Sequence, residues 1–545
     1  MVALPANRAL AQDGFRSRAD QFGGRYSWPA LIIKKIPLGG GVTAAQRPLA
    51  PLVGVRIPAP QLNTRCRCSP VAALWAPALY DGPVSAYTAV ILAAGQGTRM
   101  RSRTPKVLHD LCGRSLIEWT IVAARDAGCT KLVVVDSASC PLDGFLGDDV
   151  EFVVQPEADG TAGAVAAAID ALPSGSPVVI LSGDVPLISS ETIRELVEVH
   201  EQSAAAATVA TALLEDPTGY GRVVRSADGS LEKIVETKTD GDATAEELLI
   251  GEVNSGVYVF DVAALTAALP GVDSDNSQGE RYLPAVLPLI AAAGGTVTAH
   301  AVDDPSMLLG VNDRVDLAVL RDLAQMQIIE AHLLAGVDIV APASTQIDVG
   351  VKIGADSVIE PFTALCGATV VGERSTIGPD STLLDAIVGD EVTVLRSHLT
   401  DCEVRSQASI GPFSHLRPGS LVHERAKVGA FVELKNVEIG EGAKVPHLSY
   451  VGDAEVGAGA NLGAGTITAN YDGVNKHRTI FGQRVHGGVH VSYIAPVEVG
   501  DDAWTAAGSV ITEAVPPGSL AIGRGKQENK DGYDERRKLD AKDQK

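Results

Sequence analysis

The sequence predicts two folded domains of different class, a doubly wound α/β domain followed by an all-β parallel β-helix. Between residues 88 and 312, short apolar runs alternate with helical segments, which is typical of a parallel sheet covered by helices. Beyond residue 345 an aliphatic residue returns at every sixth position, a period that belongs neither to a helix nor to simple strand alternation. A chain of 545 residues is also too long for one hydrophobic core.

The composition excludes several classes of protein. Apolar residues make up 46% and charged residues 21% of the chain, which is ordinary for a globular protein. A net charge of -22, without a basic tract after the first section, argues against nucleic acid as a partner. No apolar run reaches the ~18 residues that a membrane span needs. Seven unpatterned cysteines indicate a reducing compartment, so we expect a cytoplasmic protein.

Residues 1–86 differ from the rest of the chain. They carry ten Lys or Arg against three Asp, with many Pro, Ala and Gly, so we expect a disordered extension. A second hypothesis is that this stretch is not translated, because no Met lies between Met1 and Met100 and a start at Val84 would keep the globular sequence. A peptide from residues 1–80 in the mass spectrum of the native protein would contradict that second hypothesis.

A glycine-rich loop follows the first predicted strand, residues 88–92. The loop reads Ala93-Ala94-Gly95-Gln96-Gly97-Thr98-Arg99 and is followed by Pro105-Lys106. Glycines let backbone N–H groups approach phosphate oxygens, while Arg99 and Lys106 add the positive charge that neutralises a triphosphate. A tight turn with two solvated cations is the simpler alternative. The length of the motif directly after a strand favours a phosphate site, although it lacks the G-K-[ST] of a Walker loop.

The following segments complete the predicted α/β pattern. A capping box, Ser115 with Glu118, predicts a helix that closes near Gly128. Further strands are predicted at residues 132–135, 152–154 and 178–181, and an alanine-rich helix begins near residue 161. Asp184 follows the last of these strands, and a carboxylate at that end of a parallel sheet is a natural Mg²⁺ ligand. A turn or capping Asp is the alternative.

A long helical pattern joins the two predicted domains, from Asp313 to about Leu334. Val315, Val319, Leu323 and Met326 recur on one face. We expect a stiff helical linker over residues 313–336. The alternative is that its first two turns are an ordinary core helix of the first domain.

The period of six is the strongest structural signal in the chain. It predicts a parallel β-helix in which each aliphatic side chain points into a narrow interior and each coil covers its neighbours. The residues at this period are Ile347, Ile353, Ile359, Leu365, Val371, Ile377 and Leu383, and then Val404, Ile410, Leu416, Val422, Val428 and Leu434.

Motifs from both halves resemble those of one family, the bacterial bifunctional N-acetylglucosamine-1-phosphate uridylyltransferase/glucosamine-1-phosphate acetyltransferases. In the first half these are the glycine loop, Asp184 and the strings G-Y-G-R (219–222), I-V-E-x-K (234–238), V-N-S-G (253–256) and G-V-N-D-R (310–314). In the second half they are R-P-G (417–419), F-V-E-L-K (431–435), H-L-S-Y (447–450) and N-Y-D-G (470–473). The resemblance covers about residues 88–530 and implies a Rossmann-like nucleotidyltransferase domain, a left-handed β-helix and a homotrimer.

The resemblance also implies roles for residues of the first half. UTP and the UDP-sugar are expected to contact Leu92, Ala93, Ala94, Gly95, Lys106, Gln155, Gly160, Thr161, Gly221, Glu236, Asn254 and Asn312. Asp184 and Asn312 are expected to bind Mg²⁺, and Lys106 and Arg99 to act on the triphosphate.

In the second half the resemblance implies an acetyl-transfer site. Arg417, Lys435, Tyr450 and Asn461 are expected to bind the sugar phosphate. Acetyl-CoA is expected to contact Ala464, Asn470, Tyr471, Ala507 and Arg524. His447 is the candidate general base, because a pKa near ~6.5 suits removal of a proton from a sugar amine. A surface histidine on a turn is the alternative.

Two positions of the second half depart from the family pattern. Val489 stands where the family has a Ser that contacts acetyl-CoA, and Gly523 replaces a usual Ser before Arg524. A valine side chain cannot donate a hydrogen bond, so we expect weaker binding of acetyl-CoA and a slower second activity.

The expected function is acetylation of glucosamine-1-phosphate with acetyl-CoA and then transfer of UMP from UTP, giving UDP-N-acetylglucosamine for envelope synthesis. The expected domains are residues 87–312 for uridylyl transfer and 337–530 for the β-helix, with a charged tail at 531–545. Three alternatives stay open: uridylyl transfer alone with the β-helix as a scaffold for trimerisation, a nucleotidylyltransferase that makes an ADP- or GDP-sugar, and a non-enzymatic regulator.

Overall fold

The computed structural model of the chain describes residues 87–95, 97–142, 144–237, 242–274 and 279–543. The predicted N-terminal extension, and with it the hypothesis about Val84, lies outside these residues, as do Gln96 and Lys238 of the motifs. The predicted charged tail contains a helix, α7 (Tyr533–Asp543). None of the described helices combines the length and the hydrophobicity that crossing a membrane would require.

The first domain is built around one sheet with the strand order β11-β7-β10-β6-β1-β4-β5. Four strands are parallel and central to the site: β1 (Tyr87–Leu92), β4 (Cys129–Ser137), β5 (Val150–Gln155) and β6 (Pro177–Ser182). Each of the four predicted strands is present, longer by one or more residues at its ends. Their shared direction brings their carboxyl ends to one edge of the sheet.

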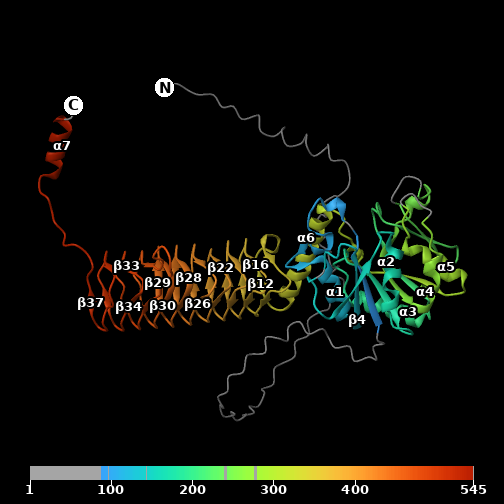
Figure 1. Ribbon diagram of the computed structural model, residues 1–545, viewed down its shortest axis with the longest axis horizontal. Coiled ribbons are helices and arrows are strands. Elements are labelled where there is room, and N and C mark those ends of the chain that lie inside the picture. Colours follow the sequence, from blue (N-terminus) through green and yellow to red (C-terminus); the bar gives the residue numbers. More distant parts are fainter. Residues whose placement is uncertain (1–86, 96, 143, 238–241, 275–278, 544–545) are drawn as a thin grey trace, which may run out of the picture. The chain divides into compact units, whose positions relative to one another are not determined.

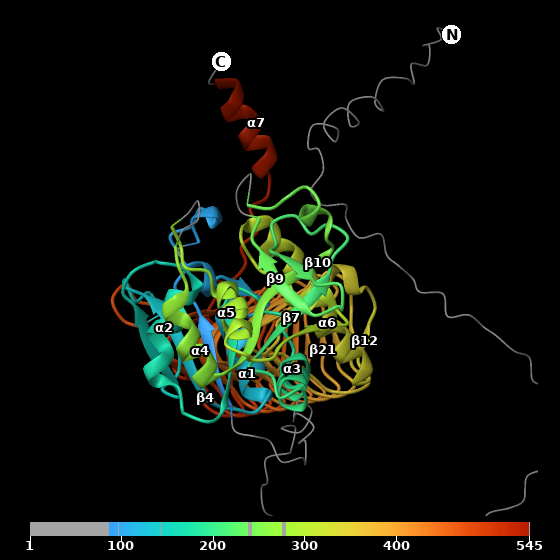
Figure 2. The same ribbon diagram turned by 90° about the vertical axis from the view of Figure 1, so that its right-hand side faces the viewer.

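The predicted parallel, doubly wound arrangement holds for these four strands, and the rest of the sheet is mixed. Strand β10 (Glu252–Asp261) is antiparallel to both β6 and β7 (Ala207–Leu213), and β11 (Val297–Ala301) is parallel to β7. The chain leaves β7 and returns through the antiparallel pair β8 (Arg222–Arg225) and β9 (Leu231–Val235) instead of a crossover helix, so β10 comes back in the opposite direction. Figure 2 shows β10 beside β7, with which it pairs.

Helices cover both faces of this sheet, as a doubly wound fold requires. Ala89 and Ile91 of β1 pack with α1 (Leu116–Asp126) and α3 (Ser190–Gln202). Val90 points to the other face, where it packs with α2 (Thr161–Ala168), α4 (Val262–Ala268) and α5 (Val286–Ala292). The predicted capping box is present at α1, because Ser115 Oγ accepts from the N–H of Glu118 while Glu118 Oε2 accepts from the N–H of Ser115 at 2.9 Å.

Helix α6 (Arg314–Leu334) follows Asp313, whose carboxylate caps it. The predicted helix is confirmed, but the predicted apolar face is wrong: Val315 and Met326 are 53% and 66% exposed. The buried face carries Leu317, Leu320, Ala324, Ile328 and Ile329. Two apolar stripes share the helical period here, and only the tertiary contacts decide which one is covered.

The buried face of α6 contacts both domains. It packs against β2 (Asp110–Leu111) of the first domain and against β12 (Asp338–Ile339) and β13 (Gln346–Ile347) of the first coil. The side-chain amide of Gln325 donates to the carbonyl oxygen of Ile347 at 2.6 Å and accepts from its N–H at 2.9 Å. The helix is therefore more than a linker, since it covers the open end of the β-helix.

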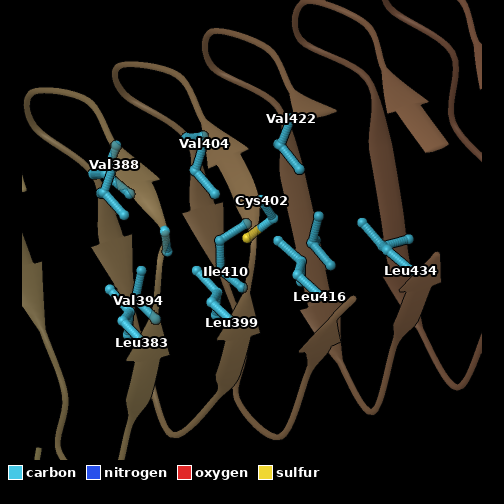
Figure 3. Close-up of a cluster of buried hydrophobic side chains, with 14 of the residues drawn as sticks. Leu383, Val388, Val394, Leu399, Cys402, Val404, Ile410, Leu416, Val422 and Leu434 are labelled. Atoms are coloured by element: carbon cyan, nitrogen blue, oxygen red, sulfur yellow. The ribbon is translucent and has the colours of Figure 1, made fainter. Parts of the chain in front are cut away.

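The second domain confirms the predicted parallel β-helix (Figure 1). The thirteen aliphatic positions named from the sequence are all at most 4% exposed. Paired residues such as Ile353 and Val371 lie one coil apart, 18 residues along the chain. Figure 3 shows the interior stack, in which Leu383, Val388 and Val394 of one coil lie beside Leu399, Val404 and Ile410 of the next.

The coils form three columns of short parallel strands. The first column contains β12, β15 (Val358–Ile359), β18 (Thr376–Ile377), β21 (Thr393–Val394), β24 (Ser409–Ile410), β27 (Lys427–Ala430) and β29 (Lys444–His447), and beyond these β35 (Trp504–Thr505) and β37 (Leu520–Ala521) pair with each other. The second contains β13, β16 (Ala364–Cys366), β19 (Thr382–Leu384), β22 (His398–Thr400), β25 (His415–Leu416), β28 (Glu433–Ile439), β30 (Tyr450–Val456), β31 (Ile467–Ala469), β33 (Ser492–Ile494) and β36 (Val510–Ile511). The third contains β14 (Lys352–Ile353), β17 (Val370–Val371), β20 (Ile387–Val388), β23 (Cys402–Val404), β26 (Ser420–Val422), the second halves of β28 and β30, β32 (Thr479–Phe481) and β34 (Val497–Val499).

The gap in the sequence period between Leu383 and Val404 has a structural cause. Ile377 pairs with Val394, 17 residues on, and Val388 with Val404, 16 residues on. These coils have lost one or two residues from their turns, which breaks the period of six. Their inward side chains Val388, Val394 and Leu399 nevertheless remain in the stack.

Candidate functional sites

The glycine loop lies at the carboxyl end of β1. Ala93 donates its N–H to the carbonyl oxygen of Val135, so the loop starts in register with the sheet. Gly97 has φ +59, and a Cβ added there would lie 2.6 Å from the Cβ of Lys106. A glycine is therefore required at this position, because it allows both the left-handed backbone and the close approach of Lys106.

Lys106 and Asp184 form an ion pair across the sheet edge. Nζ of Lys106 donates to Oδ2 of Asp184, and Ser182 Oγ donates to Oδ1 of Asp184 at 2.6 Å. The Lys106 and Asp184 side chains are only 14% and 20% exposed, so bulk water screens their charges weakly. The neighbouring Gly183 donates its N–H to the carbonyl oxygen of Leu92, which holds the Asp184 loop against the end of β1.

Arg99 and Asn312 lie beside this pair. Nη2 of Arg99 donates to Oδ1 of Asn312 at 2.9 Å. Val311 donates its N–H to the carbonyl oxygen of Asp184 at 2.8 Å, so the segment that carries Asn312 is joined directly to the Asp184 loop. The structure thus places Arg99, Lys106, Asp184 and Asn312 in one cluster at one edge of the sheet.

The oxygen atoms of Asp184 and Asn312 fit a Mg²⁺ ion in kind. Each already faces a cationic group, Lys106 or Arg99, so this place stabilises positive charge. In the part of the chain that the structure describes, no three His, Cys, Asp or Glu side chains gather as a complete metal site. Two protein oxygens completed by phosphate oxygens and water are the usual arrangement of Mg²⁺ where phosphates react.

A cavity of about 570 Å³ opens beside the cluster. Its walls include the predicted residues Ala93, Ala94, Gly95 and Gln155 at the ends of β1 and β5. They also include Pro105 of the motif and the preceding residues 102–104, which the motif leaves unspecified. This volume suits a small-molecule ligand.

Gly160 and Thr161 contribute mainly to the shape of this region. Gln155 Nε2 donates to the carbonyl oxygen of Gly160 at 3.1 Å and to Oδ1 of Asp159 at 2.8 Å. Gly160 has φ +105, and a Cβ there would lie 2.5 Å from the carbonyl oxygen of Arg281. Thr161 Oγ1 accepts from the N–H of Leu283, so its hydroxyl holds a neighbouring loop.

Gly221, Glu236 and Asn254 meet where β8, β9 and β10 adjoin. Asn254 donates its N–H to the carbonyl oxygen of Gly221 at 2.9 Å, and its Oδ1 accepts from the Tyr258 hydroxyl at 2.9 Å. Burial raises the pKa of Tyr258, and the charge of Glu236 adds to this; a Cβ added at Gly221 would lie 3.6 Å from the Cβ of Asn254. The three residues therefore form a second polar group in the first domain.

In the β-helix, Lys435, Tyr450 and Asn470 surround one buried carboxylate, that of Asp453. Lys435 Nζ donates to Asp453 Oδ2 at 3.1 Å, and the amide of Asn470 donates to the same oxygen. The amide of Asn470 also lies 3.4 Å from the Tyr450 hydroxyl. Sequence reasoning missed Asp453, because nothing in its local string G-D-A distinguishes it from a turn residue.

Arg417 lies near this cluster and pairs with Glu433. Nη1 of Arg417 donates to Oε1 of Glu433 at 2.9 Å, and both side chains are about two fifths exposed. Such a pair contributes little to stability, so the guanidinium stays available to a ligand.

His447 lies along a different corner of the β-helix. Four backbone hydrogen bonds follow this corner: Leu448 N–H to Ala430, Gly465 to His447, His490 to Ala464 and Gly508 to Val489. This corner therefore carries His447, Ala464, Val489 and Ala507. Among the described residues, no hydrogen bond or ion pair joins the His447 ring to Arg417 or Lys435 within one chain.

The remaining predicted residues of the acetyl-transfer site are exposed. Asn461 forms parallel bridges with Lys444 and His486 in the first strand column. Tyr471 is 61% exposed, and its hydroxyl donates to the carbonyl oxygen of Gly473. Arg524 lies exposed after the last coil, next to Gly523.

The fold and these clusters define a class of protein. A doubly wound sheet with a glycine loop, two cations and a carboxylate at its edge is a nucleotidyltransferase, and here it continues into a left-handed β-helix. Residues 89–249 match the family model of the MobA-like NTP transferase domain, which agrees with this class.

Relatives over most of the chain are named bifunctional protein GlmU. The one from Mycolicibacterium gilvum is 47% identical over 463 residues, 83% of this chain and 92% of the relative. The one from Mycolicibacterium vanbaalenii is 46% identical over 454 residues, 82% of this chain and 92% of the relative. The one from Corynebacterium aurimucosum is 47% identical over 454 residues, 82% and 93% of the two chains. The chain belongs to the GlmU family, and the resemblance and the enzyme class predicted from the sequence are confirmed.

Proposed function

We propose that this chain makes UDP-N-acetylglucosamine in two steps, as a precursor for envelope synthesis. Residues 337–530 transfer the acetyl group of acetyl-CoA to glucosamine-1-phosphate. Residues 87–312 then transfer UMP from UTP to the resulting N-acetylglucosamine-1-phosphate and release pyrophosphate. The observation that carries the proposal is the cluster of Lys106 on Asp184 and Arg99 on Asn312, beside a cavity of about 570 Å³.

Uridylyl transfer needs no general base in this proposal. The second pKa of a phosphate monoester is about 6, so the sugar phosphate is ionised at neutral pH. Its oxygen attacks the α-phosphorus in line, and pyrophosphate leaves. Lys106 and Arg99 neutralise the triphosphate and stabilise the charge that spreads over the transition state.

The cavity walls at Ala93, Ala94, Gly95 and Gln155 would then select the nucleotide, and the polar group around Asn254 would select the sugar. We assign Leu92, Ala93, Ala94, Gly95, Gln155, Gly160 and Thr161 to the uracil and ribose. Gly221, Glu236 and Asn254 are assigned to the sugar. Mg²⁺ is the proposed cofactor, held by oxygens of Asp184 and Asn312, and when bound it supplies further neutralisation of the phosphates.

Acetyl transfer uses the two corners of the β-helix. Arg417, Lys435, Tyr450 and Asn461 are assigned to glucosamine-1-phosphate. Acetyl-CoA is assigned to Ala464, Asn470, Tyr471, Ala507 and Arg524. His447 takes a proton from the sugar amine, the amine nitrogen attacks the thioester carbon, and the C–S bond breaks; the sulfur of coenzyme A leaves and takes up that proton to become the thiol.

A homotrimer supplies what one chain lacks. His447 and Lys435 lie at different corners of the same β-helix. A second copy of the chain is therefore needed to bring the corner that carries His447 against the corner that carries Lys435. We place the enzyme in the cytoplasm, where its substrates UTP and acetyl-CoA are made. The five described cysteines are all free, which suits a reducing compartment.

Incubation of the pure protein separates the candidate functions. With UTP, Mg²⁺ and N-acetylglucosamine-1-phosphate we expect UDP-N-acetylglucosamine and pyrophosphate. With glucosamine-1-phosphate in its place, product should form only when acetyl-CoA is added. Failure to use UTP in either mixture would refute the proposal, and use of ATP or GTP instead would identify a different sugar nucleotide.

A second candidate function is uridylyl transfer alone, with the β-helix as a scaffold for trimerisation. Val489 favours it, because it lies on the His447 corner, is 48% exposed and cannot donate a hydrogen bond to acetyl-CoA. Product from N-acetylglucosamine-1-phosphate but none from glucosamine-1-phosphate and acetyl-CoA would support this second candidate.

A further inference from the structure

The carboxylate of Asp453 is the centre of a hydrogen-bond cluster in β30. Its Oδ1 accepts from the Asn436 amide at 2.8 Å, and its Oδ2 accepts from Lys435 Nζ at 3.1 Å and from the Asn470 amide. The side chain is only 11% exposed. All three partners donate, so the cluster requires an ionised carboxylate.

The surrounding charges agree with an ionised Asp453. Burial alone would raise the pKa of Asp453, but the hydrogen bonds from Asn436, Lys435 and Asn470 hold it below its ordinary value. The hydrogen bond to Asp453 raises the pKa of Lys435, whereas the proximity of Lys435 lowers the pKa of Lys476. Two ammonium groups therefore lie close together, and the carboxylate offsets their repulsion.

The cluster also reaches the turn that carries Arg417. Asn436, which bonds Asp453 Oδ1, donates its N–H to the carbonyl oxygen of Pro418 at 3.3 Å. A negative charge beside a phosphate site weakens phosphate binding by itself. A carboxylate in this place is therefore useful only if it orders the groups that bind.

We propose that Asp453 is a positioning residue of the acetyl-transfer site, where it fixes the Lys435 ammonium for the phosphate of the sugar substrate. The inference rests on the proposed function of the β-helix. Asp453 does not touch the reacting atoms. Its main effect is on the binding of the sugar phosphate through Lys435, and a smaller effect on the binding of acetyl-CoA comes through Asn470.

The test is Asp453→Asn in the full chain, which keeps the shape and removes the charge. Calorimetric titration with glucosamine-1-phosphate should show a Kd raised about tenfold or more, since a charge-assisted hydrogen bond is lost. The KM for this substrate should rise with a smaller change in kcat. The KM should also rise more steeply between pH 8 and pH 10 than in the wild type, because Lys435 has lost the partner that raises its pKa.

Controls separate positioning from general damage. Uridylyl transfer by the same variant reports whether the chain is folded. Asp502→Asn removes an exposed carboxylate that pairs with Arg484 and should leave sugar-phosphate binding unchanged. Asn436→Ala removes one of the hydrogen bonds to Asp453 and should weaken the binding of glucosamine-1-phosphate less than Asp453→Asn does. If Asp453→Asn does not fold, Asn436→Ala is used in its place.

Two results would overturn the inference in distinguishable ways. If the wild type binds glucosamine-1-phosphate and Asp453→Asn binds it equally well with an unchanged pH profile, Asp453 has no positioning role. If the wild type does not bind glucosamine-1-phosphate at all, the proposed function of the β-helix fails, and the inference fails with it.

Discussion

Nζ of Lys106 is bonded to Oδ2 of Asp184 although the two residues are 78 positions apart in the chain. This contact joins the glycine loop after β1 to the loop after β6, and it puts a cation and a carboxylate side by side at the edge of the sheet.

Replacing Lys106 by Ala should lower kcat for uridylyl transfer by about 10²- to 10³-fold, because a preorganised charge at the transition state is lost. Acetyl transfer by the same protein should be unchanged. Lys131→Ala is the matched control, since Lys131 pairs with Glu151 outside the cluster. Steady-state assays of both activities check this, and equal losses in the two variants would argue against a role for Lys106.

Gly97→Ala tests the loop geometry. An alanine Cβ would lie 2.6 Å from Lys106 Cβ, so the lysine must move, and the left-handed backbone adds a cost of about 1–2 kcal/mol. Gly175→Ala is the control, because Gly175 also has a positive φ, +83, with nothing within 4 Å of the added Cβ. Both variants should lose stability in urea denaturation, but only Gly97→Ala should lose most of its uridylyl transfer. Retained activity would mean that the loop tolerates the displacement.

Stability should fall as the pH is lowered below about 6.5. Burial lowers the pKa values of His109, His200 and His332, and Arg314 adds to this at His109. The unfolded chain then takes up protons in a pH range where the folded chain does not, which costs at most about 1.4 kcal/mol per pH unit for each histidine. Urea denaturation at pH 7.5, 6.5 and 5.5 measures how steeply the free energy of unfolding depends on pH. His332→Gln should make the free energy of unfolding depend less steeply on pH. If the substitution leaves this dependence unchanged, His332 does not contribute to it.

Val489→Ser should restore a hydrogen-bond donor at the corner that carries His447. One such bond is worth about 1 kcal/mol, so the Kd for acetyl-CoA should fall about fivefold. Val340→Ser is the control, because Val340 is similarly exposed, 51% against 48%, but lies at the first coil. Calorimetric titration with acetyl-CoA checks this, and equal affinity of Val489→Ser and the wild type would show that Val489 does not limit binding.

Elements that depend on local sequence could be predicted well. The four strands around β1, the capping box at Ser115 and the thirteen interior positions of the β-helix are present, because each depends on spacing along a short stretch of chain. The apolar face of α6 could not be predicted, because its two stripes have the same period and tertiary packing decides between them.

The residues of the candidate sites also fall into two groups, those that the local sequence predicts and those whose role depends on tertiary contacts. Asp184 could be named because it follows a strand of a parallel sheet closely, and Lys106 because it belongs to the motif of the glycine loop after β1; the fold brings these two loops together. Asp453 could not, because its importance comes from Lys435 and Asn470, which the coiling of the β-helix brings to it. The separation of His447 from Lys435 also follows from the coil geometry, which a linear motif does not contain.

The contact of α6 with the first coil has a practical consequence for dividing the enzyme. Gln325 and the buried face of α6 shield the otherwise uncovered edge at Ile347, as an end cap does in other repetitive folds. A fragment of the β-helix that begins after α6 would present a bare strand edge and invite self-association. A fragment that begins before Asp313 would keep its cover and be the better starting point for studying acetyl transfer in isolation.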